Sequence, residues 1–257
     1  MIAPGFYQGD ALAMLKRCKS ESFQTCITSP PYWSLRTYGS NPGEIGCEPY
    51  SAQYIAALVL VFREVRRTLR RDGTFWLNVG DVFNAYNANR GPSQGLSKKR
   101  DGDRVSGGDI PRGLTDAALR NKALMGLPWR LALALQEDGW ILRSEIIWHK
   151  QTSTPERTKD RPSREHEHLF LLTKHDRYKY RKEALPEARR TVWKIPSRND
   201  GPAHSARFPD ELARRCLLLS CAPGDLALDP FAGSDTVGRI ASVLDILSVR
   251  FDLQGEL

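Results

Sequence analysis

Residues 28–33, with the sequence TSPPYW, combine side chains and carbonyls suited to hold a flat group that carries an amino function. Two consecutive prolines cannot continue a strand or enter a helix interior, so the chain must leave the apolar stretch 25–27 at this point. The carbonyls of Ser29 and Pro30 then lie beside the rings of Tyr32 and Trp33. Rigid acceptors next to an aromatic stacking surface suit a nucleobase, although a proline-rich ligand segment or an ordinary turn has the same composition.

A second run of chemical interest, residues 229–238 (DPFAGSDTVG), follows the apolar stretch 226–228 and opens a helix. Small residues at a strand-to-helix turn let a ligand approach the backbone, and helix N-terminal amides favour an anionic group. Asp252 ends a further strand-like stretch, 247–252, where an acid can accept both hydroxyls of a ribose. Because many nucleotide-binding folds share this arrangement, it indicates only a nucleotide-like ligand.

The elements that must position these runs alternate between strands and helices. The helix predicted over 51–71 has an apolar stripe that includes Tyr54, Leu58 and Val65, and Asp72-Gly73 is expected to close it. The stretch 168–173 is predicted to be a strand paired with 178–180. Further strands are expected at 6–8, 25–28, 74–79, 140–148, 226–228 and 247–252, and further helices at 11–18, 127–136 and 208–219. The alternation predicts an α/β fold with a mostly parallel twisted sheet and helices on both faces.

The composition is that of a globular protein, and its basic charge favours a polyanionic partner over a generic basic protein only modestly. The 257 residues are 40% hydrophobic and 26% charged, and the formal net charge is +8. A single domain over 1–257, located in the cytoplasm, is expected, because no apolar run is long enough for a membrane span and no signal peptide precedes the first strand. The five cysteines lack Cys-x-x-Cys spacing, and His149, His166 and His168 have no supporting ligands, so no metal site is expected.

Two polar, basic segments, 84–122 and 150–200, are expected to be inserted loops that recognise the target. Long loops inside a compact domain are usually functional or disordered, and Lys and Arg in them would contact phosphates. A solvated, flexible loop is the alternative reading for both segments, and Arg157, Arg161 and Arg164 fit either reading.

In combination, these runs resemble the amino-directed DNA methyltransferases that use S-adenosylmethionine. The resemblance extends over nearly the whole chain, with further blocks in family order at 9–12, 77–81, 126–130, 148–150 and 166–167. It points to the circularly permuted (beta-type) group, in which the catalytic motif precedes the cofactor motif. A Rossmann-like methyltransferase fold is what this resemblance implies.

The resemblance also implies a role for individual residues. The catalytic residues would be Ser29, Pro30, Pro31 and Tyr32. The cofactor S-adenosylmethionine would contact Phe231 and Gly233, with the turn shaped by Asp229, Ser234 and Thr236. Asp252 would bind the ribose, Asp10 would accept the adenine amino group, and the Phe208-Pro209 helix start would border the methionine end.

The resemblance implies that the target is a base amino group in double-stranded DNA. Carbon-5 methylation of cytosine needs a cysteine, typically within a Pro-Cys motif, and no Pro-Cys dipeptide occurs. Adenine-N6 enzymes usually carry Asp before Pro-Pro-Tyr, so Ser29 favours cytosine-N4, with adenine-N6 as the alternative. The base would be flipped out of the duplex and stacked on Tyr32. A homodimer and a cognate restriction endonuclease are partners left open.

One residue departs from the family pattern in the cofactor turn. Asp235 stands where the family has glycine, and its charge would approach the cofactor's carboxylate. A DNA-binding module with impaired catalysis is therefore a second hypothesis, and methylation of RNA or of a protein glutamine is a third. Relatives usually continue past the position of Asp252 into another helix, so one sheet face is expected to be exposed or covered by a partner subunit.

Overall fold

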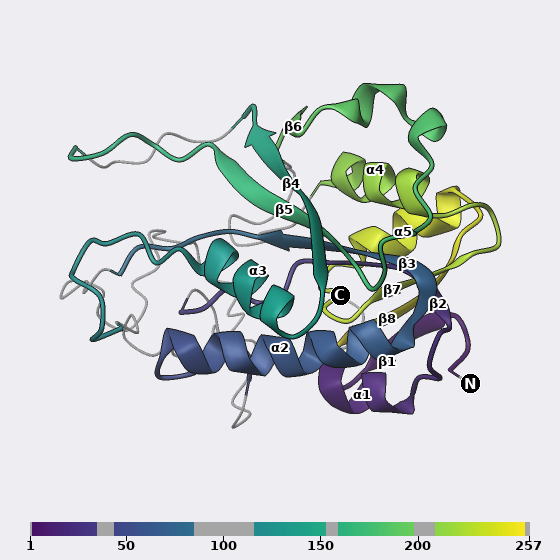
Figure 1. Ribbon diagram of the computed structural model, residues 1–257, viewed down its shortest axis with the longest axis horizontal. Coiled ribbons are helices and arrows are strands. Elements are labelled where there is room, and N and C mark those ends of the chain that lie inside the picture. Colours follow the sequence, from purple (N-terminus) through teal and green to yellow (C-terminus); the bar gives the residue numbers. More distant parts are fainter. Residues whose placement is uncertain (1, 35–43, 85–115, 153–158, 198–208, 255–257) are drawn as a thin grey trace, which may run out of the picture.

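The computed structural model describes residues 2–34, 44–84, 116–152, 159–197 and 209–254, and these form one eight-stranded sheet with helices on both faces (Figure 1). The strand order is β1-β8-β7-β2-β3-β5-β4-β6. Strand β5 is antiparallel to both of its neighbours, and the other pairs are parallel. The strands are β1 Gly5–Gln8, β2 Phe23–Thr28, β3 Leu69–Val79, β4 Ile141–Lys150, β5 His166–Thr173, β6 Val192–Ile195, β7 Leu226–Asp229 and β8 Leu247–Asp252.

Two helical layers cover the sheet and confirm the predicted α/β class. Helices α1 (Ala11–Arg17), α2 (Ser51–Thr68) and α3 (Leu127–Glu137) lie on one face, and α4 (Asp210–Ser220) and α5 (Thr236–Val243) on the other (Figure 1). Two short 3₁₀ helices, Lys182–Ala184 and Pro186–Arg189, precede β6. Side chains alternate along a strand, so Phe75 and Trp76 of β3 enter separate apolar cores on the two faces.

The predicted end of the helix over 51–71 is wrong. Helix α2 ends at Thr68, the Leu69 amide donates to the Val65 carbonyl, and the chain enters β3 directly. The stretch around Asp72-Gly73 is a bulge within β3, since Phe23 pairs with Leu69 but Thr25 pairs with Thr74. Leu69 is buried as it would be in a helix, so apolar periodicity alone could not place the boundary.

The pairing predicted between 168–173 and 178–180 is also wrong. Both edges of β5 are occupied, by β3 and by β4, so no edge is open to residues 178–180. The segment 150–200, expected as an insertion, contributes β5 and β6 to the central sheet. Of the described residues in this segment, 151–152, 159–165, 174–191 and 196–197 lie outside the sheet. Strands β4 and β5 are antiparallel neighbours joined by residues 151–165 (Figure 1).

The sheet places the runs 28–33 and 229–238 side by side, at the carboxyl ends of two neighbouring strands. The chain winds from β7 through β8 in one direction and from β2 to β3 in the other, so the order reverses between β7 and β2. In open α/β sheets, ligands bind outside the carboxyl ends of the strands at such a reversal. Residues 28–33 and 229–238 leave β2 and β7 at this point.

Candidate active site

A buried hydrogen bond joins the two runs where they leave the sheet. The Thr28 hydroxyl donates to Oδ1 of Asp229 at 2.6 Å, and the Phe231 amide donates to the same oxygen at 3.1 Å. Thr28 and Asp229 are both almost wholly buried. The residue before Ser29 is therefore fixed to the residue that begins the glycine turn, although 201 positions separate them.

The environment of Asp229 favours its protonated form. Burial raises the pKa of this carboxyl to about 7, and the charges of Asp235 and Asp252 add to that effect. The hydrogen bonds from Thr28 and from the Phe231 amide act in the opposite direction. The connection between the two runs is thus sensitive to protonation near neutral pH.

Replacing this carboxyl by an amide, Asp229→Asn, is expected to change how stability depends on pH. Because the folded pKa lies above the ordinary value of 3.8, the stabilisation from protonation is complete below about pH 4 and is lost as pH rises through 7. From about pH 5 to about pH 8 the wild type should lose up to about 3 kcal/mol of unfolding free energy relative to the variant. Urea unfolding of both proteins at both pH values measures this difference. The same change in unfolding free energy for wild type and variant would contradict the raised pKa.

The run 28–33 is held at several points. The Tyr54 hydroxyl donates to the Pro31 carbonyl at 2.8 Å, and the Trp33 indole N–H donates to the Glu48 carbonyl at 2.8 Å. Trp33 is 1% exposed, so it is a core residue and offers no stacking surface. The aromatic face expected from the sequence is therefore supplied by Tyr32, which is half-buried.

The Tyr32 ring lies against Gly80, the residue that follows β3. A β-carbon on Gly80 would stand 2.6 Å from Cε2 of Tyr32, so only glycine leaves room for the ring. Beyond Gly80, the Tyr32 hydroxyl donates to Oε2 of Glu167 at 2.8 Å, and the Ser29 hydroxyl donates to the Tyr32 oxygen at 3.4 Å. Burial and the Glu167 charge raise the pKa of Tyr32, so the phenol stays protonated.

The glycine turn and the acid at the end of β8 lie together. The Asp252 carboxylate accepts the Gly233 amide at 2.8 Å and the Gln254 amide at 2.9 Å. Gly233 has φ +51°, and no atom lies within 4 Å of where its β-carbon would be, so the turn has open space there. Phe231 is half-buried, with its ring edge-on to Phe62. An open glycine turn beside a fixed carboxylate fits a nucleoside ligand.

The remaining sequence-predicted residues surround this turn, with one exception. Thr236 is buried at the first position of α5, and Ser234 is half-buried in the turn. Asp10 lies beyond β1, which pairs with β8 through Gln8 and Asp252, and one of its oxygens caps α1 by accepting the Ala13 amide at 2.8 Å. Phe208 lies outside the described residues.

Asp235 is paired with a cation. Its backbone is left-handed, with φ +56°, and its Oδ1 lies 2.9 Å from Nε of Arg250 on β8. Both side chains are largely buried, and a β-carbon on Gly238 would stand 2.2 Å from the same carboxylate oxygen. Gly238 thus leaves room for an ion pair that offsets the charge of Asp235. Nothing in the spacing of the residues indicated this partner.

His166 and His168 lie in a separate polar cluster next to Trp129 of α3. Nδ1 of His168 lies 2.6 Å from Oε1 of Glu145, and its ring stacks on Phe170. Burial and the neighbouring His168 lower the pKa of His166. No group of three or more potential metal ligands occurs among the residues that the structure describes. The helices in those same parts of the chain include none with the length and apolarity of a membrane span.

The fold and the site define a class, the methyltransferases with a Rossmann-like sheet. Residues 23–255 match the N6/N4 methyltransferase family, described as DNA methylases, and the chain belongs to this family. The protein is therefore an enzyme of the DNA methyltransferase class.

Characterised relatives and solved structures agree with this membership. The chain is 45% identical over 258 residues to the type II methyltransferase M.Cfr9I of Citrobacter freundii, covering 97% of this chain and 83% of that protein. It is 43% identical over 259 residues to M.SmaI of Serratia marcescens, covering 96% and 86%.

Among solved structures, the PvuII DNA methyltransferase (cytosine-N4-specific) shares the fold, with a TM-score of 0.73 at 18% identity over 99% of this chain and 83% of that chain. TTHA0409 of Thermus thermophilus, a putative DNA modification methylase solved in complex with S-adenosyl-L-methionine, gives a TM-score of 0.62 at 25% identity. That match covers 97% of this chain and 89% of that chain.

Proposed function

We propose that this enzyme transfers the methyl group of S-adenosylmethionine to the exocyclic N4 of a cytosine flipped out of double-stranded DNA. The observation that carries the proposal is the Ser29 hydroxyl at the head of Pro-Pro-Tyr, fixed beside the Asp229 turn through Thr28. The named specificity of the PvuII enzyme and the named ligand of TTHA0409 support the base and the cofactor.

The run 28–33 is proposed to activate the amino nitrogen of the base, which is a poor nucleophile. The lone pair of a base amino nitrogen is conjugated with the ring, so the amino group must be held and repolarised before it can react. Ser29 donates its own proton towards Tyr32, which leaves its oxygen lone pairs to accept an amino hydrogen. The Pro30 carbonyl is the second proposed acceptor. Positioning and electrostatics of this kind carry most of the catalysis.

The glycine turn is the proposed cofactor site. When bound, S-adenosylmethionine supplies an electrophilic methyl group on a sulfonium sulfur. Asp252 keeps lone pairs for the ribose hydroxyls after accepting its two amides. Asp229 holds this turn at a fixed distance from Ser29. The other residues proposed to contact the cofactor are Phe231, Gly233, Ser234 and Thr236 in the wall of the turn, Asp10 at the adenine end and Phe208 at the methionine end.

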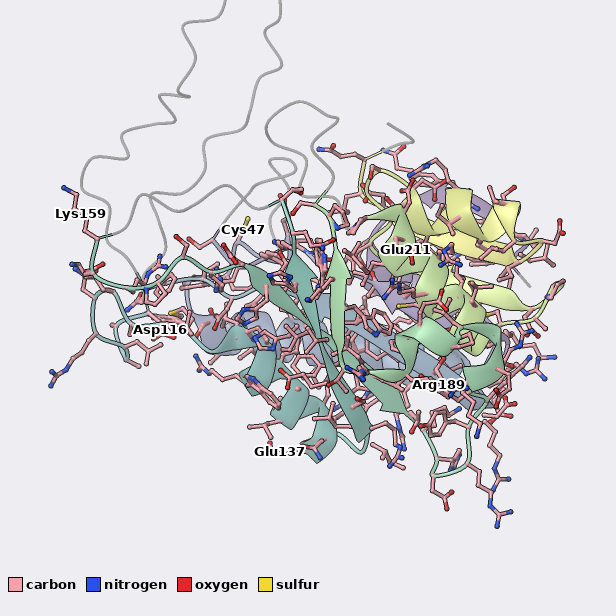
Figure 2. All side chains as sticks on the ribbon, turned by 90° about the horizontal axis from the view of Figure 1, so that it is seen from above. Cys47, Asp116, Glu137, Lys159, Arg189 and Glu211 are labelled. Carbon is pink, nitrogen blue, oxygen red and sulfur yellow. The ribbon has the colours of Figure 1, made fainter. Side chains whose placement is uncertain are left out.

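DNA is proposed to approach the edge from which the β4–β5 connection projects. Arg161 stacks on Phe83 with its guanidinium 3.6 Å from the ring centroid, and the Arg164 guanidinium donates to the Asp81 carbonyl. Figure 2 shows the Lys159 side chain extending away from the protein in the same segment. We infer that 84–122 and the loop parts of 150–200 read the target sequence, and that Tyr32 stacks on the flipped base.

The type II names of the relatives suggest the cellular setting. We propose that the enzyme works in the cytoplasm in a restriction–modification system, beside an endonuclease of the same sequence specificity. A second copy of the chain is a further proposed partner, which analytical ultracentrifugation of the free enzyme tests.

The variant Arg250→Gln is expected to weaken cofactor binding about tenfold, because it leaves the Asp235 carboxylate uncompensated beside a ligand that carries a carboxylate. The double variant Asp235→Gly, Arg250→Gln should recover most of that loss. Isothermal titration measures the cofactor affinity of the wild type, the single variant and the double variant. Equal affinities for wild type and Arg250→Gln would show that the ion pair has no bearing on the cofactor site.

The proposal is tested by following a labelled methyl group from the cofactor. Unmethylated genomic DNA in duplex form should accept label, and equal masses of total RNA or of protein should neither accept it nor compete. Digestion of the labelled DNA to nucleosides should place the label in N4-methylcytosine. Label in RNA or in protein glutamine, with none in DNA, would overturn the proposal.

A further inference from the structure

We infer that Glu167, held by Lys150, is a positioning residue that sets the direction of the hydrogen bonds from Ser29 through Tyr32. The inference rests on the proposed function of the same site and assigns a task to two residues of the β4–β5 hairpin. Neither of them is expected to touch the base or the cofactor.

The direction of the bonds follows from the acceptor at their end. An ionised carboxylate can only accept, so Glu167 requires the Tyr32 hydroxyl to donate to it at 2.8 Å. The Tyr32 oxygen then accepts from Ser29 at 3.4 Å. With its proton committed to Tyr32, Ser29 presents lone pairs, which is the polarity that an amino group needs.

A cation fixes the carboxylate in turn. Nζ of Lys150 lies 2.5 Å from Oε1 of Glu167, and the same Nζ lies over the Trp148 ring, 4.9 Å from its centroid. The side chain of Glu167 is 14% exposed and that of Lys150 is 25% exposed. Trp148 is buried and donates its indole N–H to the Ile195 carbonyl, so the platform beneath Lys150 is rigid.

The placement of the pair ties it to the hairpin. Lys150 is the last residue of β4 and Glu167 the second residue of β5, so they bracket the connection 151–165. Tyr32 reaches them past Gly80, the residue that follows β3, where a side chain would collide with its ring. A hairpin proposed to face DNA therefore holds the phenol on which the flipped base would stack.

The test is the variant Glu167→Gln in single-turnover methyl transfer. An uncharged amide can also donate, so it no longer enforces the direction of the two bonds. We expect the rate constant for methyl transfer to fall about tenfold, with cofactor affinity within about twofold of wild type. Glu137→Gln is the matched control, because this exposed carboxylate at the end of α3 belongs neither to the proposed site nor to the proposed recognition segments. Thermal melting verifies that each variant is folded.

A double-mutant cycle separates positioning from a general structural role. In a Tyr32→Phe background, Glu167→Gln should change the rate less than about twofold, because the bond through which it acts is already absent. An undiminished tenfold effect in that background, or a Glu167→Gln variant as fast as wild type, would overturn the inference. Failure of the proposed function is recognised separately, since wild type would then transfer no label to cytosine N4.

Discussion

Replacing the stacking tyrosine, Tyr32→Ala, should lower the rate of methyl transfer between about 10- and 100-fold and leave cofactor affinity nearly unchanged. Stacking of a base on an aromatic side chain contributes about 1–3 kcal/mol, and the variant also loses the hydrogen bond to Glu167. The proposed cofactor contacts lie at the ends of β7 and β8, with the Asp229–Thr28 bond intact. Single-turnover rates and isothermal titration provide the two quantities.

The conservative variant Tyr32→Phe distinguishes the ring from its hydroxyl. It keeps the stacking surface above Gly80 and removes only the bonds to Ser29 and Glu167, so its rate should lie between those of wild type and Tyr32→Ala. If Tyr32→Ala weakened cofactor binding as much as it slowed transfer, Tyr32 would support the structure of the whole site. It would then have no specific role with the base.

The second large effect is expected at Asp252. The variant Asp252→Ala should weaken S-adenosylmethionine binding about 100-fold, because hydrogen bonds to a charged acceptor contribute about 1.5–3 kcal/mol each. It also removes the acceptor of the Gly233 amide, which loosens the turn. Equilibrium titration of the cofactor measures the loss, and DNA affinity without cofactor should stay as in wild type.

The amide variant Asp252→Asn provides the graded comparison. It retains the size of the side chain and one carbonyl acceptor, so a loss of about tenfold is expected. Equal affinity for wild type and Asp252→Ala would mean that the acid at the end of β8 serves only to fix the turn. The ribose would then have to be bound by other groups.

Much of the fold could be predicted from the sequence because its strands are short apolar runs that end in recognisable turns. The alternation of strands and helices indicated the α/β class, and the TSPPYW and DPFAGSD runs marked the two halves of the site. The end of α2 escaped prediction because Leu69 is buried whether the chain is helical or extended. Trp33 is buried and does not share the expected stacking surface with Tyr32, because only packing distinguishes these two aromatic residues.

The contacts that escaped prediction join residues distant in the sequence. Glu167 and Lys150 lay in stretches marked by resemblance, but no spacing rule connects them with Tyr32 across the glycine that follows β3. The pairing of Arg250 with Asp235 likewise became visible only once β8 was placed beside the turn. The charge of Asp235, on which the hypothesis of impaired catalysis rests, therefore has a partner within the protein.

The most direct test of the central claim is the identity of the methylated nucleoside. Mixed-sequence duplex DNA is incubated with the enzyme and S-adenosylmethionine carrying a deuterated methyl group, then digested and analysed by mass spectrometry. The Ser29 hydroxyl at the head of Pro-Pro-Tyr predicts deuterated N4-methylcytosine as the product, reduced at least about tenfold with Tyr32→Ala at matched short times. Deuterated N6-methyladenine, or unmodified DNA with an enzyme that binds the cofactor normally, would contradict it.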